Sequence, residues 1–168
     1  MRGYVPLGKF AGAGTPFEWP QAIGHDRQPF ASFPCGTGQL TAGPDGLALA
    51  IFGWVDPSTF EVSNAQMPEG LLGFVLPVIG AWRWDRAYRC KGLTILRPGL
   101  PCVLAIAGDF IARFPLGAQA GAQVWTDPAT GLPYTADGGG FIATPWTAMQ
   151  SGGPGARCRI SSFARPVN

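Results

Sequence analysis

The chain has 168 residues, 25 of them glycine and 17 proline, with 13% charged residues and a formal net charge of +2 at pH 7. This much glycine and proline excludes a helical bundle or coiled coil, and the 46% of hydrophobic residues argues against a disordered chain. The small net charge gives no reason to expect a nucleic-acid partner. We therefore expect one all-β domain, barrel-like or sandwich-like, with many loops.

Residues 1–34 have no hydrophobic period, and prolines and aromatic side chains are interspersed along them. Proline favours an extended backbone, while aromatic side chains such as Phe17 and Trp19 need a surface to pack against. We predict that residues 1–34 form an extended N-terminal arm, which lies along its own domain or along a neighbouring chain. Residues 35–168 then form the β domain.

The first strands of that domain are expected between residues 47 and 78. Residues 47–55 are apolar on both faces, which predicts one strand buried on both sides. The Asp-Pro-Ser-Thr sequence at residues 56–59 predicts a type I turn, and residues 60–63 return as its partner strand. Residues 71–78 are predicted to form another buried strand.

Residues 82–91 combine arginines with aromatic side chains, and their alternation predicts a strand with one polar face, with a helix as the alternative. Arginine and aromatic residues are favoured where proteins bind other proteins, and they also bind single-stranded nucleic acid. A local excess of positive charge on a nearly neutral chain suits an acidic protein surface better than nucleic acid. The alternative is a solvated edge strand guarded by charge.

The rest of the chain alternates short apolar runs with turn sequences. Gly108 and Asp109 should interrupt one long strand by a bulge or a tight turn. Gly131 should supply a positive φ in the hairpin loop of residues 127–131. About nine to eleven strands are expected in all, typical of a β-tulip, a jelly roll or a related barrel or sandwich. The later strands are predicted at residues 93–95, 102–107, 110–114, 123–126, 132–135 and 157–161, with a short strand pair at 141–144 and 146–149.

One segment of the chain is echoed further along: Trp-Val-Asp-Pro-Ser-Thr at residues 54–59 matches Trp-Thr-Asp-Pro-Ala-Thr at 125–130. Either two halves of a barrel share a hairpin, or the same turn chemistry arose twice. Asp-Pro turns are common, which favours the second explanation.

No constellation for catalysis is visible. The single histidine, His25, lies in the arm, the carboxylates are scattered, and no glycine cluster carries the lysine of a phosphate-binding loop. The four cysteines are not spaced as metal ligands, and we expect reduced, mostly buried thiols. We therefore predict no enzyme, no cofactor and no metal. The cysteines are Cys35, Cys90, Cys102 and Cys158.

The chain also shows no sign of a membrane segment. Its longest apolar run, residues 71–82, is interrupted by Gly73, Pro77 and Gly80 and is too short to span a bilayer. The N-terminus lacks the apolar core of a signal peptide. We expect a soluble protein that is made in a reducing cytosol and does not bind membranes.

An ordered series of short segments spans roughly residues 35 to 165. These are TAGPDGL at 41–47, IFGWVDP at 51–57, VSNA at 62–65, GLLGFV at 70–75, ILRPGLP at 95–101, VL at 103–104, AGDF at 107–110, GAQVW at 121–125 and DPATG at 127–131. In this order they resemble the structural cement proteins of tailed bacteriophage heads. The chain departs from that family in three places: it lacks a polar, histidine-containing turn after residue 75, it is richer in tryptophan and arginine at 82–89, and its arm is aromatic.

The resemblance implies a virion protein that binds the outer surface of the assembled capsid and bridges major capsid subunits. It implies self-association as well, as a trimer or dimer at a symmetry axis, and it brings no catalytic residues. The alternative is a carbohydrate- or receptor-binding β module on the virion surface, supported by tryptophan and tyrosine platforms. The residues that we expect to contact the capsid or a neighbouring subunit are Phe17, Trp19, Trp82, Arg83, Trp84, Arg86 and Arg89.

Overall fold

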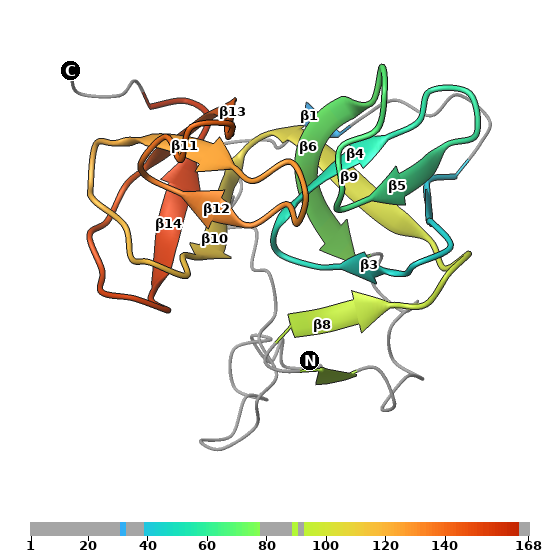
Figure 1. Ribbon diagram of the computed structural model, residues 1–168, viewed down its shortest axis with the longest axis horizontal. Helices are drawn as coiled ribbons and strands as arrows, with labels where there is room; N and C mark the ends of the chain where they lie inside the picture. Colours follow the sequence, from blue (N-terminus) through green and yellow to red (C-terminus); the bar gives the residue numbers. More distant parts are fainter. Residues whose placement is uncertain (1–30, 33–38, 78–88, 91–92, 165–168) are drawn as a thin grey trace, which may run out of the picture.

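The computed structural model describes residues 31–32, 39–77, 89–90 and 93–164, and this part of the chain is all-β (Figure 1). It contains fourteen strands in three sheets, and no helix occurs among the described residues. The predicted fold class is therefore confirmed. The strands outnumber the prediction because several of them are only two residues long.

The largest sheet has six strands, all antiparallel to their neighbours except β2, which runs parallel to β5. In order across the sheet they are β1 (Ala31–Ser32), β9 (Cys102–Ala107), β6 (Leu71–Pro77), β4 (Phe52–Val55), β5 (Glu61–Ser63) and β2 (Thr41–Ala42). The last residues of the predicted arm thus join this sheet through β1, while residues 1–30 and 33–34 of the arm lie outside the described residues.

The two smaller sheets are entirely antiparallel. The five-stranded sheet contains, in order, β10 (Asp109–Arg113), β14 (Arg157–Ser161), β13 (Ile142–Ala148), β11 (Gln123–Thr126) and β12 (Pro133–Tyr134). The three-stranded sheet contains β3 (Leu47–Ala48), β8 (Leu93–Leu96) and β7 (Arg89–Cys90).

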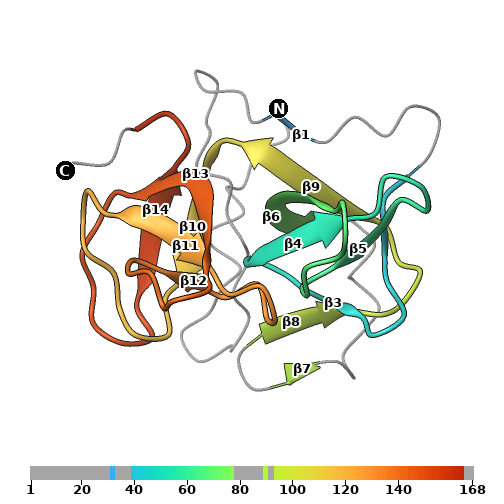
Figure 2. The same ribbon diagram turned by 45° about the horizontal axis from the view of Figure 1, so that its top comes forward.

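The six-stranded sheet has a hydrophobic core on each face, because successive side chains of a strand point to opposite sides. Phe74 and Leu76 of β6 belong to the core shared with the five-stranded sheet, whereas Val75 belongs to the core shared with β3 and β8. Figure 2 shows the five-stranded sheet beside the six-stranded sheet and the three-stranded sheet below it.

Four aromatic rings join the six-stranded and five-stranded sheets. The ring of Phe74 stacks on that of Phe110 with centroids 5.0 Å apart, and Phe52 contacts both Phe74 at 5.5 Å and Trp146 at 5.4 Å. Each such pair contributes about 0.5–1.5 kcal/mol beyond the burial of its area. The two sheets therefore share one continuous core.

The predicted single strand over residues 47–55 is wrong, because the chain changes sheets in its middle. β3 pairs with β8, whereas β4 pairs with β6, and between them Ala50 has a φ of 61°. The Asn64 side chain compensates for the break, since its Nδ2 donates to the carbonyl oxygens of Ala48 at 3.1 Å and Phe52 at 3.0 Å. The prediction of burial holds, because the apolar side chains face two different cores.

The predicted strand pair at residues 141–149 is also wrong, because β13 runs through Pro145 as one strand. Proline has no N–H to donate to a neighbouring strand. The pairing of β11 with β13 is irregular at this point, and the Gln123 side chain fills the irregularity by donating to the carbonyl oxygens of Thr144 and Trp146. The predicted break at Gly108, with a φ of 143°, is confirmed.

The five-stranded sheet repeats the arrangement of five strands of the six-stranded sheet. The strands of the larger sheet follow the order β1-β9-β6-β4-β5, and those of the smaller sheet follow β10-β14-β13-β11-β12. If the five strands of each set are numbered along the chain, both sheets have the spatial order first, fifth, fourth, second, third. All neighbouring strands in both sets are antiparallel. We call β1, β4, β5, β6 and β9 the first half and β10 to β14 the second half. The first half has four additional strands, β2, β3, β7 and β8.

The register of the two halves agrees with the sequence echo. Trp54 pairs with Ser63 and Leu72, and Trp125, its counterpart in the echo, pairs with Tyr134 and Ala143, the counterparts of these two partners. The two Asp-Pro turns match as well. The carbonyl oxygen of Asp56 accepts from the N–H of Phe60 at 2.9 Å, and that of Asp127 accepts from Gly131 at 2.8 Å. The echo therefore belongs to two halves that share a hairpin, which was the less favoured explanation.

Among the described residues, the side chains of Cys102 and Cys158 are buried. Burial raises the pKa of the Cys158 thiol, which lowers the fraction of reactive thiolate. In a variant with Cys35→Ser and Cys90→Ser, we expect no reaction with Ellman's reagent in the folded protein at pH 8 and two reacting thiols after unfolding. Reaction of the folded variant at the rate of a free thiol would contradict this packing.

Candidate interaction surface

Most of the residues predicted to make contacts lie outside the described residues: Phe17, Trp19, Trp82, Arg83, Trp84 and Arg86. Arg89 is described as part of β7, where it pairs with Thr94 of β8. The prediction of a strand over residues 82–91 is therefore confirmed only for residues 89–90. β7 is an edge of the three-stranded sheet.

Two loops of the second half contain no charged side chain. Residues 115–122 connect β10 to β11, and residues 149–156 connect β13 to β14. Ala118 and Gly152 join the loops by exchanging N–H to carbonyl hydrogen bonds of 2.9 and 3.0 Å. We call these two segments the neutral loop pair. Figure 1 shows the pair on the side of the five-stranded sheet that faces away from the six-stranded sheet.

The neutral loop pair exposes two large apolar side chains. Leu116 is 76% exposed, and Met149 is 42% exposed. Gly117 has a φ of 93°, and a side chain there would collide with the carbonyl of Gly152, so the loops approach as closely as backbone allows. A rigid, uncharged surface with exposed apolar residues is suited to contact with another protein.

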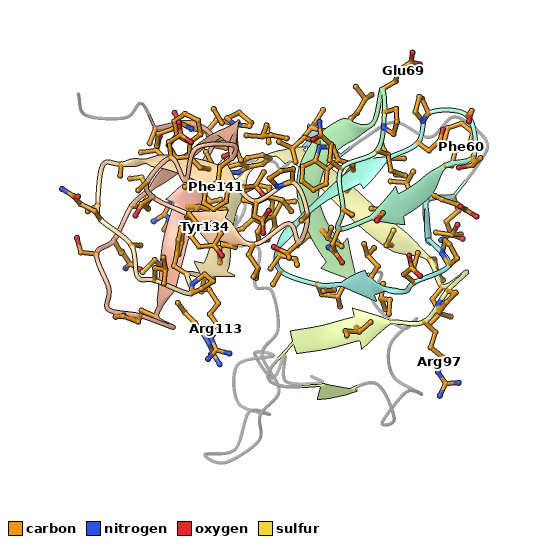
Figure 3. The ribbon with its side chains drawn as sticks, in the orientation of Figure 1. Phe60, Glu69, Arg97, Arg113, Tyr134 and Phe141 are labelled. Atoms are coloured by element: carbon orange, nitrogen blue, oxygen red, sulfur yellow. The ribbon has the colours of Figure 1, made fainter. Side chains whose placement is uncertain are left out.

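Three arginines border the neutral loop pair. Arg113 ends β10, and Arg157, directly opposite it, begins β14, with Arg159 on the same face two residues later. The Arg113 Nε donates to the carbonyl oxygen of Gly155 at 3.2 Å, which ties it to the loops (Figure 3). We call the loop pair and these arginines the arginine-framed surface.

Arg159 also forms an ion pair with Asp109, whose side chain is only 1% exposed. The two residues lie 50 positions apart in the chain, one at the start of β10 and one in β14. The Oδ1 of Asp109 and the Nε of Arg159 are buried without a hydrogen-bond partner among the described residues. The ion pair thus holds the guanidinium of Arg159 in place at the edge of the surface.

The opposite end of the molecule is acidic. Val55 of β4 pairs with Val62 on one side and with Leu71 on the other, which brings the ends of three strands together. Asp56, Glu61 and Glu69 lie at or next to these strand ends, and Leu71, on the face of the sheet opposite to Glu61, is 48% exposed. We call the group the acidic end; its residues are Asp56, Glu61, Glu69 and Leu71, and Figure 3 shows Glu69 at this end of the first half.

The Asp56 carboxylate of the acidic end is held in its charged form. The hydroxyl and the N–H of Ser58 donate to its Oδ1 at 2.6 and 2.7 Å, and these bonds lower the pKa of Asp56 below its usual value. The charged Asp56 carboxylate therefore stabilises the folded protein fully at pH values above the ordinary pKa of an aspartate. This stabilisation is lost as the pH falls through the lowered pKa of Asp56.

The second half also carries three half-exposed aromatic side chains. The rings of Tyr134 and Phe141 stack with centroids 4.6 Å apart (Figure 3), and Trp125 pairs with Tyr134 across β11 and β12. Tyr134 and Phe141 cover one face of each other's ring, which leaves less ring surface for a ligand.

Neither a protein-family model nor a curated protein matches this chain. Among the described residues, no group of three histidine, cysteine or carboxylate side chains is placed to hold a metal ion. The described residues also contain no helix long and apolar enough to cross a bilayer.

Sequence reasoning missed the arginine-framed surface, although two signals for it were present. Residues 114–126 and 138–156 contain no charged side chain, and Arg113 and Arg157 stand directly outside these two runs. The sequence does not reveal that the two runs lie side by side, because β10 and β14 come from opposite ends of the second half and meet only in the folded sheet.

Proposed function

We propose that the chain is a cement or decoration protein that binds the outer surface of an assembled phage head and bridges its major capsid subunits. The observation that carries the proposal is the ordered series of segments resembling the cement family. Within the described residues, these segments lie on strands and turns of an all-β body with tightly hydrogen-bonded loops. Such a body can transmit load between neighbouring subunits.

A cement protein needs many modest contacts that capsid symmetry repeats, since multivalency multiplies weak binding. The uncharged, exposed neutral loop pair offers one area for such contacts. The residues that remain our proposed capsid or subunit contacts are Phe17, Trp19, Trp82, Arg83, Trp84, Arg86 and Arg89. We propose copies of the same chain at a symmetry axis as further partners. No nucleic acid, membrane, cofactor or catalytic step enters the mechanism.

The proposal is tested by binding to heads that lack the protein. Purified chain is mixed with expanded heads from a phage carrying a deletion of its gene, and the heads are pelleted. We expect saturable binding with a fixed number of copies per head and none to unassembled capsid subunits. The variant Trp82→Ala/Trp84→Ala should bind at least tenfold more weakly, whereas Arg97→Glu should bind as wild type. Failure to saturate would overturn the proposal.

A glycan-binding module is the second candidate, and the three half-exposed aromatic side chains of the second half favour it. Aromatic faces bind sugar rings. If this were the function, Trp125→Ala would abolish binding to a glycan array while leaving head binding unchanged. Absence of any glycan binding by the wild-type chain would remove this candidate.

A further inference from the structure

We infer that the exposed Asp137–Gly138 bond is a site of spontaneous modification, where the aspartate converts to isoaspartate through a cyclic succinimide. The sequence contains one other Asp-Gly pair, Asp45–Gly46, and the fold protects it. The modification concerns the chemistry of the chain itself, so it stands or falls separately from the proposed function.

The reaction needs only the chain and water. The peptide nitrogen of Gly138 attacks Cγ of the protonated Asp137 carboxyl group and loses its proton, and the hydroxyl leaves as water, which closes the imide ring. One water molecule then opens the ring. Opening at Cγ restores aspartate, whereas opening at the main-chain carbonyl carbon gives isoaspartate, in which the backbone continues through Cγ. Glycine favours the attack because it has no side chain to restrict its backbone.

The loop between β12 and β13 leaves this bond accessible. Residues 136–140 are all exposed, and nothing lies within 4 Å of a Cβ added at Gly139 or Gly140. The Asp137 Oδ1 accepts from the N–H of Gly139 at 2.9 Å. This hydrogen bond closes a ring that contains the Gly138 nitrogen, so the carboxyl group is held near the atom that attacks it. The N–H of Gly138 itself donates no hydrogen bond to any described residue.

The other Asp-Gly pair is fixed in its turn. The N–H of Gly46 donates to the carbonyl oxygen of Gly43 at 3.0 Å, so its nitrogen is already engaged. A Cβ added at Gly46 would lie 2.8 Å from the carbonyl oxygen of Leu96, which shows that β8 packs directly against this glycine. The fully buried Leu47 follows as the first residue of β3. The 45–46 peptide therefore cannot turn toward the Asp45 carboxyl group without disrupting the start of β3.

Isomerisation at Asp137 also affects the aromatic pair beside the loop. A Cβ added at Gly138 would lie 2.5 Å from the ring of Phe141, so this ring rests against the glycine. Phe141 in turn stacks on Tyr134 with ring centroids 4.6 Å apart (Figure 3). Isoaspartate adds a carbon atom to the backbone directly before Gly138, which displaces the glycine relative to the ring. We expect the stacked pair to loosen as the modification accumulates.

The site is tested by incubating the full chain at neutral pH, folded or in guanidinium chloride. After digestion, isoaspartate is measured in each Asp-Gly peptide by peptide mapping and by methylation with protein isoaspartate methyltransferase. In the folded chain, isoaspartate should form at residue 137 at least tenfold faster than at residue 45. In the denaturant the two positions should react at similar rates, because only the fold distinguishes them.

The variant Asp137→Glu is the matched control, because glutamate would have to close a larger ring. It should form no modified residue at position 137 and leave position 45 unchanged. The near-ultraviolet circular dichroism of the wild-type chain should change as isoaspartate accumulates, and that of the variant should stay constant. Equal rates at the two positions in the folded chain would overturn the inference. Isoaspartate that forms at residue 137 only in the denaturant would overturn it as well.

Discussion

Replacing Gly131 with alanine should lower the free energy of unfolding by about 3 kcal/mol, because the change combines a backbone penalty with the loss of a contact between the halves. Gly131 has a φ of 71°, where a side chain costs about 1–2 kcal/mol. An added Cβ would also collide with the carbonyl oxygen of Phe52 and lie 3.1 Å from that of Asn64. The loop would have to withdraw from the first half, and the hydrogen bond from Phe52 would be lost. Chemical denaturation measures the change.

Two other glycines provide matched controls for the backbone penalty. Gly99 and Gly139 have φ values of 76° and 77°, and nothing lies within 4 Å of an added Cβ at either position. Alanine there should cost only about 1 kcal/mol. The difference between Gly131→Ala and these controls isolates the docking of the hairpin on the first half. Equal losses at all three positions would show that this docking contributes nothing to stability.

Replacing Arg159 with methionine should cost about 3–5 kcal/mol, because it leaves the buried carboxylate of Asp109 without its partner. The Asp109 side chain is 1% exposed and that of Arg159 is 40% exposed, so water would replace the guanidinium only in part. The double variant Arg159→Met/Asp109→Asn should recover most of this loss, because an amide is neutral and costs less to bury than a carboxylate. The measurement is the free energy of unfolding of both variants at neutral pH.

Arg113→Met is the matched control for the loss of Arg159. Arg113 is exposed and lies in the neighbouring strand β10, so its replacement should change stability by no more than about 0.5 kcal/mol. If Arg159→Met lowered the free energy of unfolding no more than Arg113→Met, the ion pair would not stabilise the fold. A double variant no more stable than Arg159→Met would show that the charge of Asp109 is not the cause of the loss.

Local chemistry made much of the fold predictable. The Asp-Pro turns at residues 56 and 127 follow from the preference of aspartate and proline for turn positions, and both form with the same hydrogen bonds. Gly131 adopts the predicted positive φ because glycine alone enters that region without a penalty. The alternation of residues 157–161 also predicted a strand, which the structure has as β14.

Features that depend on distant parts of the chain were not predictable. The positive φ of Ala50 is imposed by the change from one sheet to another and by the side chain of Asn64, not by any preference of alanine. Pro145 remains inside a strand because Gln123 satisfies the neighbouring carbonyl groups. In both cases a side chain far along the sequence compensates for a local defect.

The candidate interaction surface also combines features that the sequence predicts with features that only the fold reveals. The absence of charge from residues 114–126 and 138–156 is visible in the sequence, but the pairing that places Arg113 beside Arg157 is not. The acidic end likewise needs the register that places Leu71 next to Val55. The tryptophan echo was visible, and its meaning became clear only from the equal strand order of the two halves.

The most direct test of the central claim is the temperature at which filled heads release their DNA. Heads that lack the protein are compared with the same heads after saturation with purified chain, and release is followed with a DNA-binding dye. The cement role predicts a higher rupture temperature that rises with the number of copies bound and reaches a plateau at saturation. Saturated heads that rupture at the same temperature as bare heads would contradict it.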